Sequence, residues 1–179
     1  VFKLIMRRVK KMTTNQFRMK KLLTDFIIIN IIINGAFYLF NFRNHKGPVT
    51  FDTISTDLII GLIILAIFCP AAGFINIPKA INKQQLDLSK RKRSSIHRFF
   101  PQKNSHRSLL LSVLIISVSY LSFILLPNLL GLEGINHTIG FSFKVITAII
   151  MSGIADFVVI ELTLDDYQEK QITIRSVPK

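Results

Sequence analysis

The sequence contains few of the residue types that build cysteine- or histidine-based sites. One cysteine, Cys69, stands among 179 residues, which excludes an intramolecular disulfide and a cysteine-based zinc site. The four histidines are scattered without metal-ligand spacing. No Walker motif is present, so an ATP-driven role would require a partner chain. We therefore expect no cofactor, no metal and no catalytic residues.

Tryptophan is absent and acidic residues are scarce, with 10 Asp and Glu against 23 Lys and Arg. Together with the abundance of Ile, Asn and Lys, this composition suggests an AT-rich bacterial gene. A net charge of +13 can indicate nucleic-acid binding, but its distribution argues against it. Eight of the basic residues lie in the first 21 positions and nine more lie between 79 and 107. The charge is therefore concentrated in two segments that flank apolar sequence.

Long apolar runs dominate the rest of the chain, which is 50% hydrophobic and 18% charged. They cover residues 22–42, 58–77, 109–130 and 145–164. A hydrocarbon core about 30 Å thick requires about 20 helical residues, so each run can span a bilayer. Backbone polar groups in lipid must be satisfied internally, so the spans should be helices. The first run is longer than the apolar region of a signal peptide and is not followed by an A-x-A-like cleavage site, so we expect it to be a membrane span and not a cleaved signal peptide.

The charge on the connecting segments predicts the orientation. The connections after the first and third spans hold only Arg43 and Lys46, with Lys144 at the edge of the fourth span. By the positive-inside rule, both termini and the 78–108 loop are cytoplasmic. We predict an all-α, multi-pass protein of the cell membrane, with four transmembrane helices arranged as two antiparallel hairpins. Residues 1–21 are a basic arm, 22–164 the transmembrane domain and 165–179 a cytoplasmic tail.

Basic residues close to the spans are expected to contact lipid. A Lys or Arg near an anionic membrane surface contributes about 1 kcal/mol to binding. The bilayer with anionic headgroups is therefore an expected partner, whereas nucleic acid is not. The candidate headgroup contacts are Lys20, Lys21, Lys90, Arg91, Lys92 and Arg93.

Polar residues inside the spans are the best available indicators of function. Asp156 lies near mid-depth in the fourth span, where even lenient insertion scales assign about 2.5–3.5 kcal/mol to a carboxylate. At 100° per residue, the first, third and fourth helices each have one polar face, and we expect all three to point inward. The predicted intramembrane polar site comprises Asp156, Asn30, Asn34, Ser152, Ser112 and Ser119.

Two interpretations of Asp156 stay open. As a neutral acid bonded to Asn30 or Ser112, it would be structural, because polar groups at such spacing commonly join helices. As a group that changes charge, it would serve a proton, cation or cationic substrate. In the second span, Pro70 removes the hydrogen bond to Ala66 and predicts a kink.

The string from Gly61 to Ala80, GLIILAIFCPAAGFINIPKA, ends its helix with Pro78 and a basic Lys79. In this it resembles small bacterial membrane proteins of unknown function that are built from tandem two-helix hairpins. The second hairpin departs from that pattern, because residues 162–166 (LTLDD) contain neither proline nor base. The resemblance implies an architecture and no chemistry.

Two functional classes follow. The favoured one is an accessory or interaction protein of the bacterial cell membrane, without catalytic activity of its own. The alternative is a small oligomeric transporter, or a transporter subunit, that uses the intramembrane carboxylate of Asp156. Four helices rarely enclose a pathway alone, so a carrier would require dimerisation. The expected protein partners are a second copy of the chain or a larger membrane complex.

Overall fold

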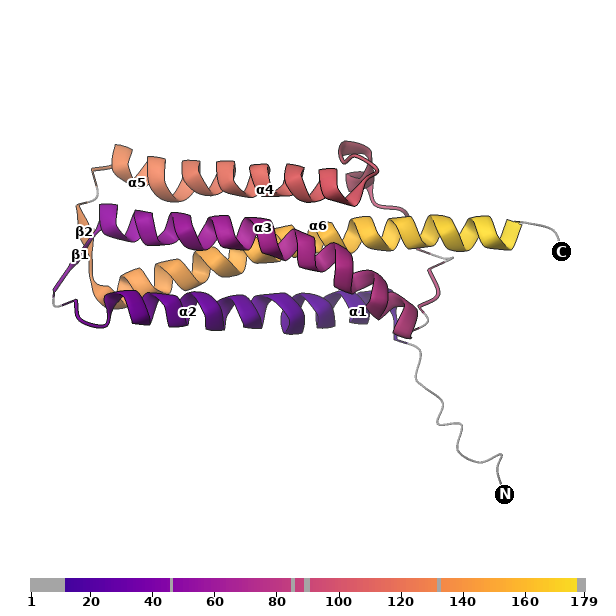
Figure 1. Ribbon diagram of the computed structural model, residues 1–179, viewed down its shortest axis with the longest axis horizontal. Coiled ribbons are helices and arrows are strands. Elements are labelled where there is room, and N and C mark those ends of the chain that lie inside the picture. The colour runs from indigo at the N-terminus through magenta and orange to yellow at the C-terminus, as the bar shows by residue number, and fades with distance from the viewer. Residues whose placement is uncertain (1–11, 46, 85, 89–90, 132, 177–179) are drawn as a thin grey trace, which may run out of the picture.

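The computed structural model describes residues 12–45, 47–84, 86–88, 91–131 and 133–176. Its described part contains four helical segments long and apolar enough to cross a membrane, as the sequence predicted. They lie side by side, and the described part of the chain begins and ends at the same end of the bundle (Figure 1). Described residues of the predicted basic arm begin at Met12, so residues 1–11 of that arm lie outside the described part.

The four segments differ in how continuous they are. The first consists of α1, a π-helical turn and α2; the third consists of α4, a second π-helical turn and α5. The second and fourth, α3 and α6, are unbroken α-helices. Their bounds are α1 Thr14–Lys21, π turn Leu22–Ile27, α2 Ile28–Phe42, α3 Phe51–Gln84, α4 Asn104–Tyr120, π turn Leu121–Leu125, α5 Leu126–Leu129 and α6 His137–Ser176.

The helices extend beyond the apolar runs at the end where the termini lie. A capping box starts α1, since the Thr13 hydroxyl accepts from the Gln16 amide and the Gln16 side chain accepts from the Thr13 amide. At the other extreme, α6 continues through the predicted tail to Ser176 and projects past the bundle (Figure 1). Apolar length limits a membrane span, but a helix can continue into water on polar residues.

The main interfaces are not those within the two predicted hairpins, since α2 makes few contacts with α3 and α4 makes few contacts with α6. The main interfaces join α3 with α6, α3 with α4 and α2 with α6, whereas α2 and α3 touch at few points. The first two helices therefore do not form a close hairpin. Small residues explain the preference for α6, which presents Gly140, Ala148 and Ala155 as buried positions. In lipid, such residues let neighbouring helices approach closely.

α3 bends in its second half (Figure 1), where it contains Pro70 and Pro78. In this half, α3 packs closely against α6 at Gly73. A Cβ atom on Gly73 would lie 2.8 Å from Cγ1 of Val159 and 3.6 Å from the ring of Phe26. The bend and the glycine together bring three helical segments into contact at one level of the bundle.

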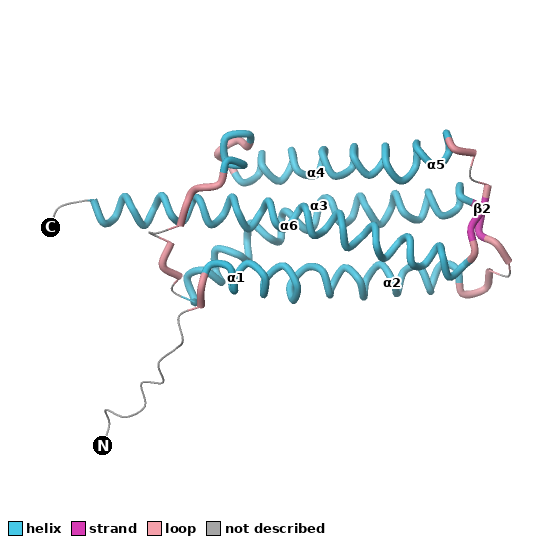
Figure 2. The backbone as a smooth tube through the Cα atoms, turned by 180° about the vertical axis from the view of Figure 1, so that it is seen from behind, coloured by secondary structure: helices cyan, strands magenta, loops and turns pink. Residues whose placement is uncertain are grey.

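The two ends of the bundle are closed differently. At one end a short antiparallel pair, β1 Val49–Thr50 and β2 Gly134–Ile135, joins the two connections (Figure 2). Beside it Tyr38 is fully buried, and its hydroxyl donates to the carbonyl of His137 at 3.0 Å. At the other end, the connection between α3 and α4 contains a 3₁₀ turn, Ser95–Phe99, and folds back on α6.

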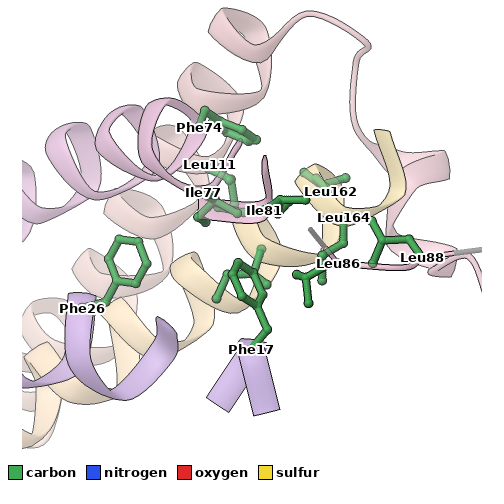
Figure 3. Close-up of a cluster of buried hydrophobic side chains, with 12 residues drawn as sticks. Phe17, Phe26, Phe74, Ile77, Ile81, Leu86, Leu88, Leu111, Leu162 and Leu164 are labelled. Atoms are coloured by element: carbon green, nitrogen blue, oxygen red, sulfur yellow. The ribbon is translucent and has the colours of Figure 1, made fainter. Parts of the chain in front are cut away.

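A cluster of large apolar side chains fills the end near the termini (Figure 3). Phe17 from α1 meets Ile77 and Ile81 from α3 and Leu164 from α6, while Leu88 from the connection is fully buried. The apolar side chains of α2 and α4, in contrast, are largely exposed on the outer face. An exterior of exposed Ile, Leu and Phe along these helices suits a lipid environment.

Candidate functional site

Asp156 lies inside the bundle with none of its surface exposed. Neither of its carboxylate oxygens has a hydrogen-bond partner among the described residues. The expectation that Asn30 or Ser112 would bond to it is not met. Asn30 and Ser112 both bond to backbone carbonyls instead. A buried carboxyl group without a partner is costly and calls for an explanation.

The two asparagines of α2 are buried and bond mainly within their own helix. The Asn30 amide donates to the Phe26 carbonyl at 3.1 Å, and the Asn34 amide donates to the Asn30 carbonyl at 3.0 Å. Across the interface, the Asn30 amide nitrogen lies 3.5 Å from Sγ of Cys69 on α3. The asparagines therefore face α3, as an inward polar stripe should, without reaching Asp156.

The predicted serines occupy separate positions. Ser112 on α4 donates to the carbonyl of Ala66 on α3 at 2.6 Å, and Ser152 donates to the Ile149 carbonyl in its own helix at 3.3 Å. The Ser119 hydroxyl is buried and has no partner among the described residues. The six polar residues thus lie inside one bundle, but hydrogen bonds within the described part of the chain do not join them into one network.

A cavity of about 560 Å³ lies between α2 and α3. We call it the lateral groove. Its polar lining includes Asn30, Asn34 and Cys69 near the middle, and Asp156 is not part of the lining. At the end nearest the β pair, the groove is lined by Asn41, Asp57 and Lys144.

Asp57 and Lys144 form an ion pair at that end, although they are 87 positions apart in the sequence. The Lys144 side chain is 3% exposed and that of Asp57 is 9% exposed. The second carboxylate oxygen of Asp57 accepts from the Asn41 amide at 2.6 Å. Sequence reasoning missed this pair. The available signal was that each residue directly precedes an apolar run.

At the opposite end, carboxylates of α6 hold the connection between α3 and α4. Arg91 lies between Glu161, at 2.6 Å, and Asp165. Glu161 also pairs with Arg18 of α1 at 2.6 Å, and the Ser94 amide donates to Asp165 at 3.2 Å. These carboxylates belong to an i, i+4, i+8 series that ends at Glu169, so they project from one side of α6.

Arg107 on α4 is the second anchor of this connection and is 1% exposed. Its guanidinium pairs with Asp166 and donates from Nε to the Pro101 carbonyl at 2.6 Å. His97 lies 3.3 Å from the same carboxylate. Asp166 therefore joins α6 to the 3₁₀ turn and to the first turn of α4.

Two glutamines of α6 bind the backbone of the same connection. The Gln171 side chain accepts from the Leu88 amide at 3.1 Å and donates to the Leu86 carbonyl at 2.9 Å. Gln168 donates to the Arg91 carbonyl. We call the described part of residues 86–107, together with the α6 residues 161–171 that hold it, the basic platform.

The six predicted headgroup contacts lie in different surroundings. Lys20 and Lys92 are exposed, and Arg93 is about half exposed and pairs with Glu169 at 3.2 Å. Lys21 pairs with Asp25 at 2.5 Å. Lys90 lies outside the described residues. Arg91 departs from the expectation, because burial between two carboxylates directs its charge into the protein rather than toward lipid.

No group of three or more His, Cys, Asp and Glu side chains in the described ranges is arranged to hold a metal ion. Comparison with known proteins gives no matching family model, no matching curated protein and no matching solved structure. Function must therefore be inferred from the geometry of the groove, the buried carboxyl group and the basic platform.

Proposed function

We propose that the protein is an accessory or interaction protein of the cell membrane, with no catalytic activity of its own. Its four helices anchor the basic platform, which faces the cytoplasm and engages an acidic surface of a membrane protein partner. The observation that carries this proposal is the ordered attachment of the platform to α6 by buried ion pairs.

Only some of the basic residues of the platform are paired with α6. Arg91 and Arg107 form buried ion pairs with α6 carboxylates, whereas Lys92, Arg98 and Lys103 are exposed. A surface fixed before binding loses less conformational entropy on association than a mobile loop does. The platform thus combines exposed positive charge with a preformed backbone, which suits recognition of an acidic partner.

The alternative, an oligomeric carrier that uses Asp156, has one observation in its favour. Ionisable residues inside membrane spans commonly mark ion or proton pathways, and Asp156 is such a residue, with no hydrogen-bond partner among the described residues. A carrier also requires that this group be reached by substrate or water. Asp156 is fully buried and does not line the lateral groove, so the accessory function has the better support.

Site-specific photocrosslinking in intact membranes tests the proposal. A photoreactive residue at Phe99, which is 79% exposed on the platform, is compared with one at Leu129, which is 74% exposed at the other end. We expect a discrete protein adduct from position 99, and its loss when Lys92 and Arg98 are both replaced by Glu. Adducts that are equal at both positions, or unaffected by charge reversal, would contradict the proposal.

A further inference from the structure

The lateral groove has the form of a binding site that opens toward the bilayer. α2 and α3 make few contacts with each other, and Lys144 of α6 lies in the gap between them. Its volume of about 560 Å³ falls within the range of small-molecule pockets, about 300–1,000 Å³. Access is from the side of the bundle, so an occupant arrives from the membrane.

The position of the ion pair places one end of the groove at a defined depth. Asp57 and Lys144 are each followed at once by an apolar run, 58–77 and 145–164. In a bilayer, the boundary between headgroups and acyl chains lies where such a run begins. The charged end of the groove therefore lies at headgroup level, and the rest lies beside the hydrocarbon.

The lining changes along the groove in the same way. Past the Asp57–Lys144 pair, most of the wall is apolar, with Ile33 and Phe37 from α2 and Ile60, Ile64 and Phe68 from α3. The polar residues of this part are Asn30, Asn34 and Cys69, and Asp25 and Asn76 also line the groove. The apolar walls suit an acyl chain, because an apolar chain can pack against apolar side chains without removing polar groups from water. The site is thus amphipathic along its length.

The charged end offers both signs within one hydrogen-bonded group. Lys144 supplies an almost fully buried ammonium, Asp57 a carboxylate, and Asn41 an amide that bonds to that carboxylate. Because Asp57 and Lys144 pair with each other, this end of the groove has no net charge, and an occupant with a net charge would meet no net opposite charge there. An occupant that carries both a phosphate and an ammonium can place each group beside the opposite charge.

From these observations we propose that the lateral groove binds one zwitterionic phospholipid with a primary amine headgroup. Its phosphate lies at Lys144, its ammonium lies at Asp57, and one acyl chain follows the walls of α2 and α3. Headgroup level, paired charges and apolar walls together specify this occupant. A transmembrane helix of a partner would need an acidic and a basic side chain at the same depth to replace it.

Two adjacent alanines of α3 provide a matched test. Ala72 is exposed and lines the lateral groove, whereas Ala71 is exposed and lines the cavity between α3 and α4. The full chain is delipidated in detergent and titrated with phosphatidylethanolamine, phosphatidylcholine or phosphatidylglycerol, and bound lipid is counted by native mass spectrometry. Thermal unfolding confirms that each variant is folded.

We expect one phosphatidylethanolamine per chain, bound in preference to the other two lipids. Ala72→Leu should weaken that binding about tenfold, because the larger side chain fills the part of the lateral groove that holds the acyl chain. Ala71→Leu should leave the binding unchanged. Asp57→Asn should remove the preference for the primary amine. Equal lipid binding by the two leucine variants would overturn the proposal. So would a dimer that dissociates in Ala72→Leu, because the groove would then be occupied by a second copy.

Discussion

The hydroxyl of Ser112 on α4 donates to the carbonyl of Ala66 on α3 at 2.6 Å. Ala66 precedes Pro70 by four positions, so its carbonyl is the one that proline deprives of an intrahelical donor. The neighbouring helix thus supplies the missing hydrogen bond, as transmembrane prolines commonly require. One side chain compensates for the kink and fixes the α3–α4 interface.

A double-mutant cycle tests this relationship. Ser112→Ala should lower the free energy of unfolding by about 0.6 kcal/mol, the average for interhelical hydrogen bonds in membranes, and by no more than about 1.7 kcal/mol. In a Pro70→Ala background the same change should cost clearly less, because the backbone N–H restored at position 70 then donates to the Ala66 carbonyl. Unfolding in mixed micelles measures all four proteins. Equal costs in both backgrounds would show that the hydroxyl does not compensate for the proline.

A second prediction concerns Gly140, whose missing side chain makes room for Tyr38. A Cβ atom there would overlap the Tyr38 hydroxyl and lie 3.2 Å from Ile54. Gly140→Ala should therefore destabilise the bundle by about 1–3 kcal/mol, as overpacking does. Gly153→Ala, also in α6, is the control, because a Cβ atom at that position would have nothing within 4 Å. That control should be neutral or slightly stabilising in the same unfolding assay.

The third prediction compares two neighbouring cations of the basic platform. Arg91→Ala leaves the carboxylates of Glu161 and Asp165 short of a buried partner, so it should cost about 3–5 kcal/mol. Lys92→Ala removes an exposed side chain and should change stability by less than about 0.5 kcal/mol. Limited proteolysis of the 86–103 connection gives a second measurement. Similar cleavage rates in the two variants would argue against a platform held by Arg91.

The fourth prediction is the orientation in the membrane. Single cysteines are placed at Ser95 on the platform and at Glu133 near the β pair, both exposed, in a Cys69→Ala background. An impermeant thiol reagent added to intact cells should label Glu133→Cys and not Ser95→Cys. Lysis should make both positions reactive. Labelling of Ser95→Cys in intact cells would refute the cytoplasmic location of the platform.

The last prediction separates the two functional classes at Asp156. Asp156→Asn loses no described hydrogen bond and removes the titratable charge, so the variant should fold as well as the parent. In sealed vesicles with a trapped pH-sensitive dye, an accessory protein predicts equal proton permeability for parent and variant. A proton leak or proton-coupled flux present in the parent and absent in Asp156→Asn would favour the carrier.

The number of helices could be predicted because an apolar run of about 20 residues has the length needed to span a bilayer as a helix. The ends of the helices near the termini could not be predicted from the apolar runs. Asp165 and Asp166 end the last run, yet α6 continues through them. The order of packing was also out of reach. Ile, Leu and Phe occur at both exposed and buried positions of these helices, so hydropathy does not distinguish the side of α2 that meets α6.

The candidate site could be anticipated only residue by residue. Asp156 and Asn34 are buried, as polar residues within apolar runs commonly are. Their partners depend on helix order, so bonds such as Ser112 to Ala66 required the structure. The Asp57–Lys144 pair could not be predicted either. In the sequence each is a charged residue at the start of an apolar run, and only the fold shows that the two are in contact.

The preference of α2 for α6 over α3 has a consequence for biogenesis. The first helix leaves the ribosome long before the last, yet most of its protein contacts are with that last helix. During insertion, α2 must remain surrounded by lipid or by the insertion machinery until α6 arrives. Assembly of this bundle is therefore completed by its C-terminal helix, and a chain interrupted before residue 137 would leave α2 without the helix that makes its main interface.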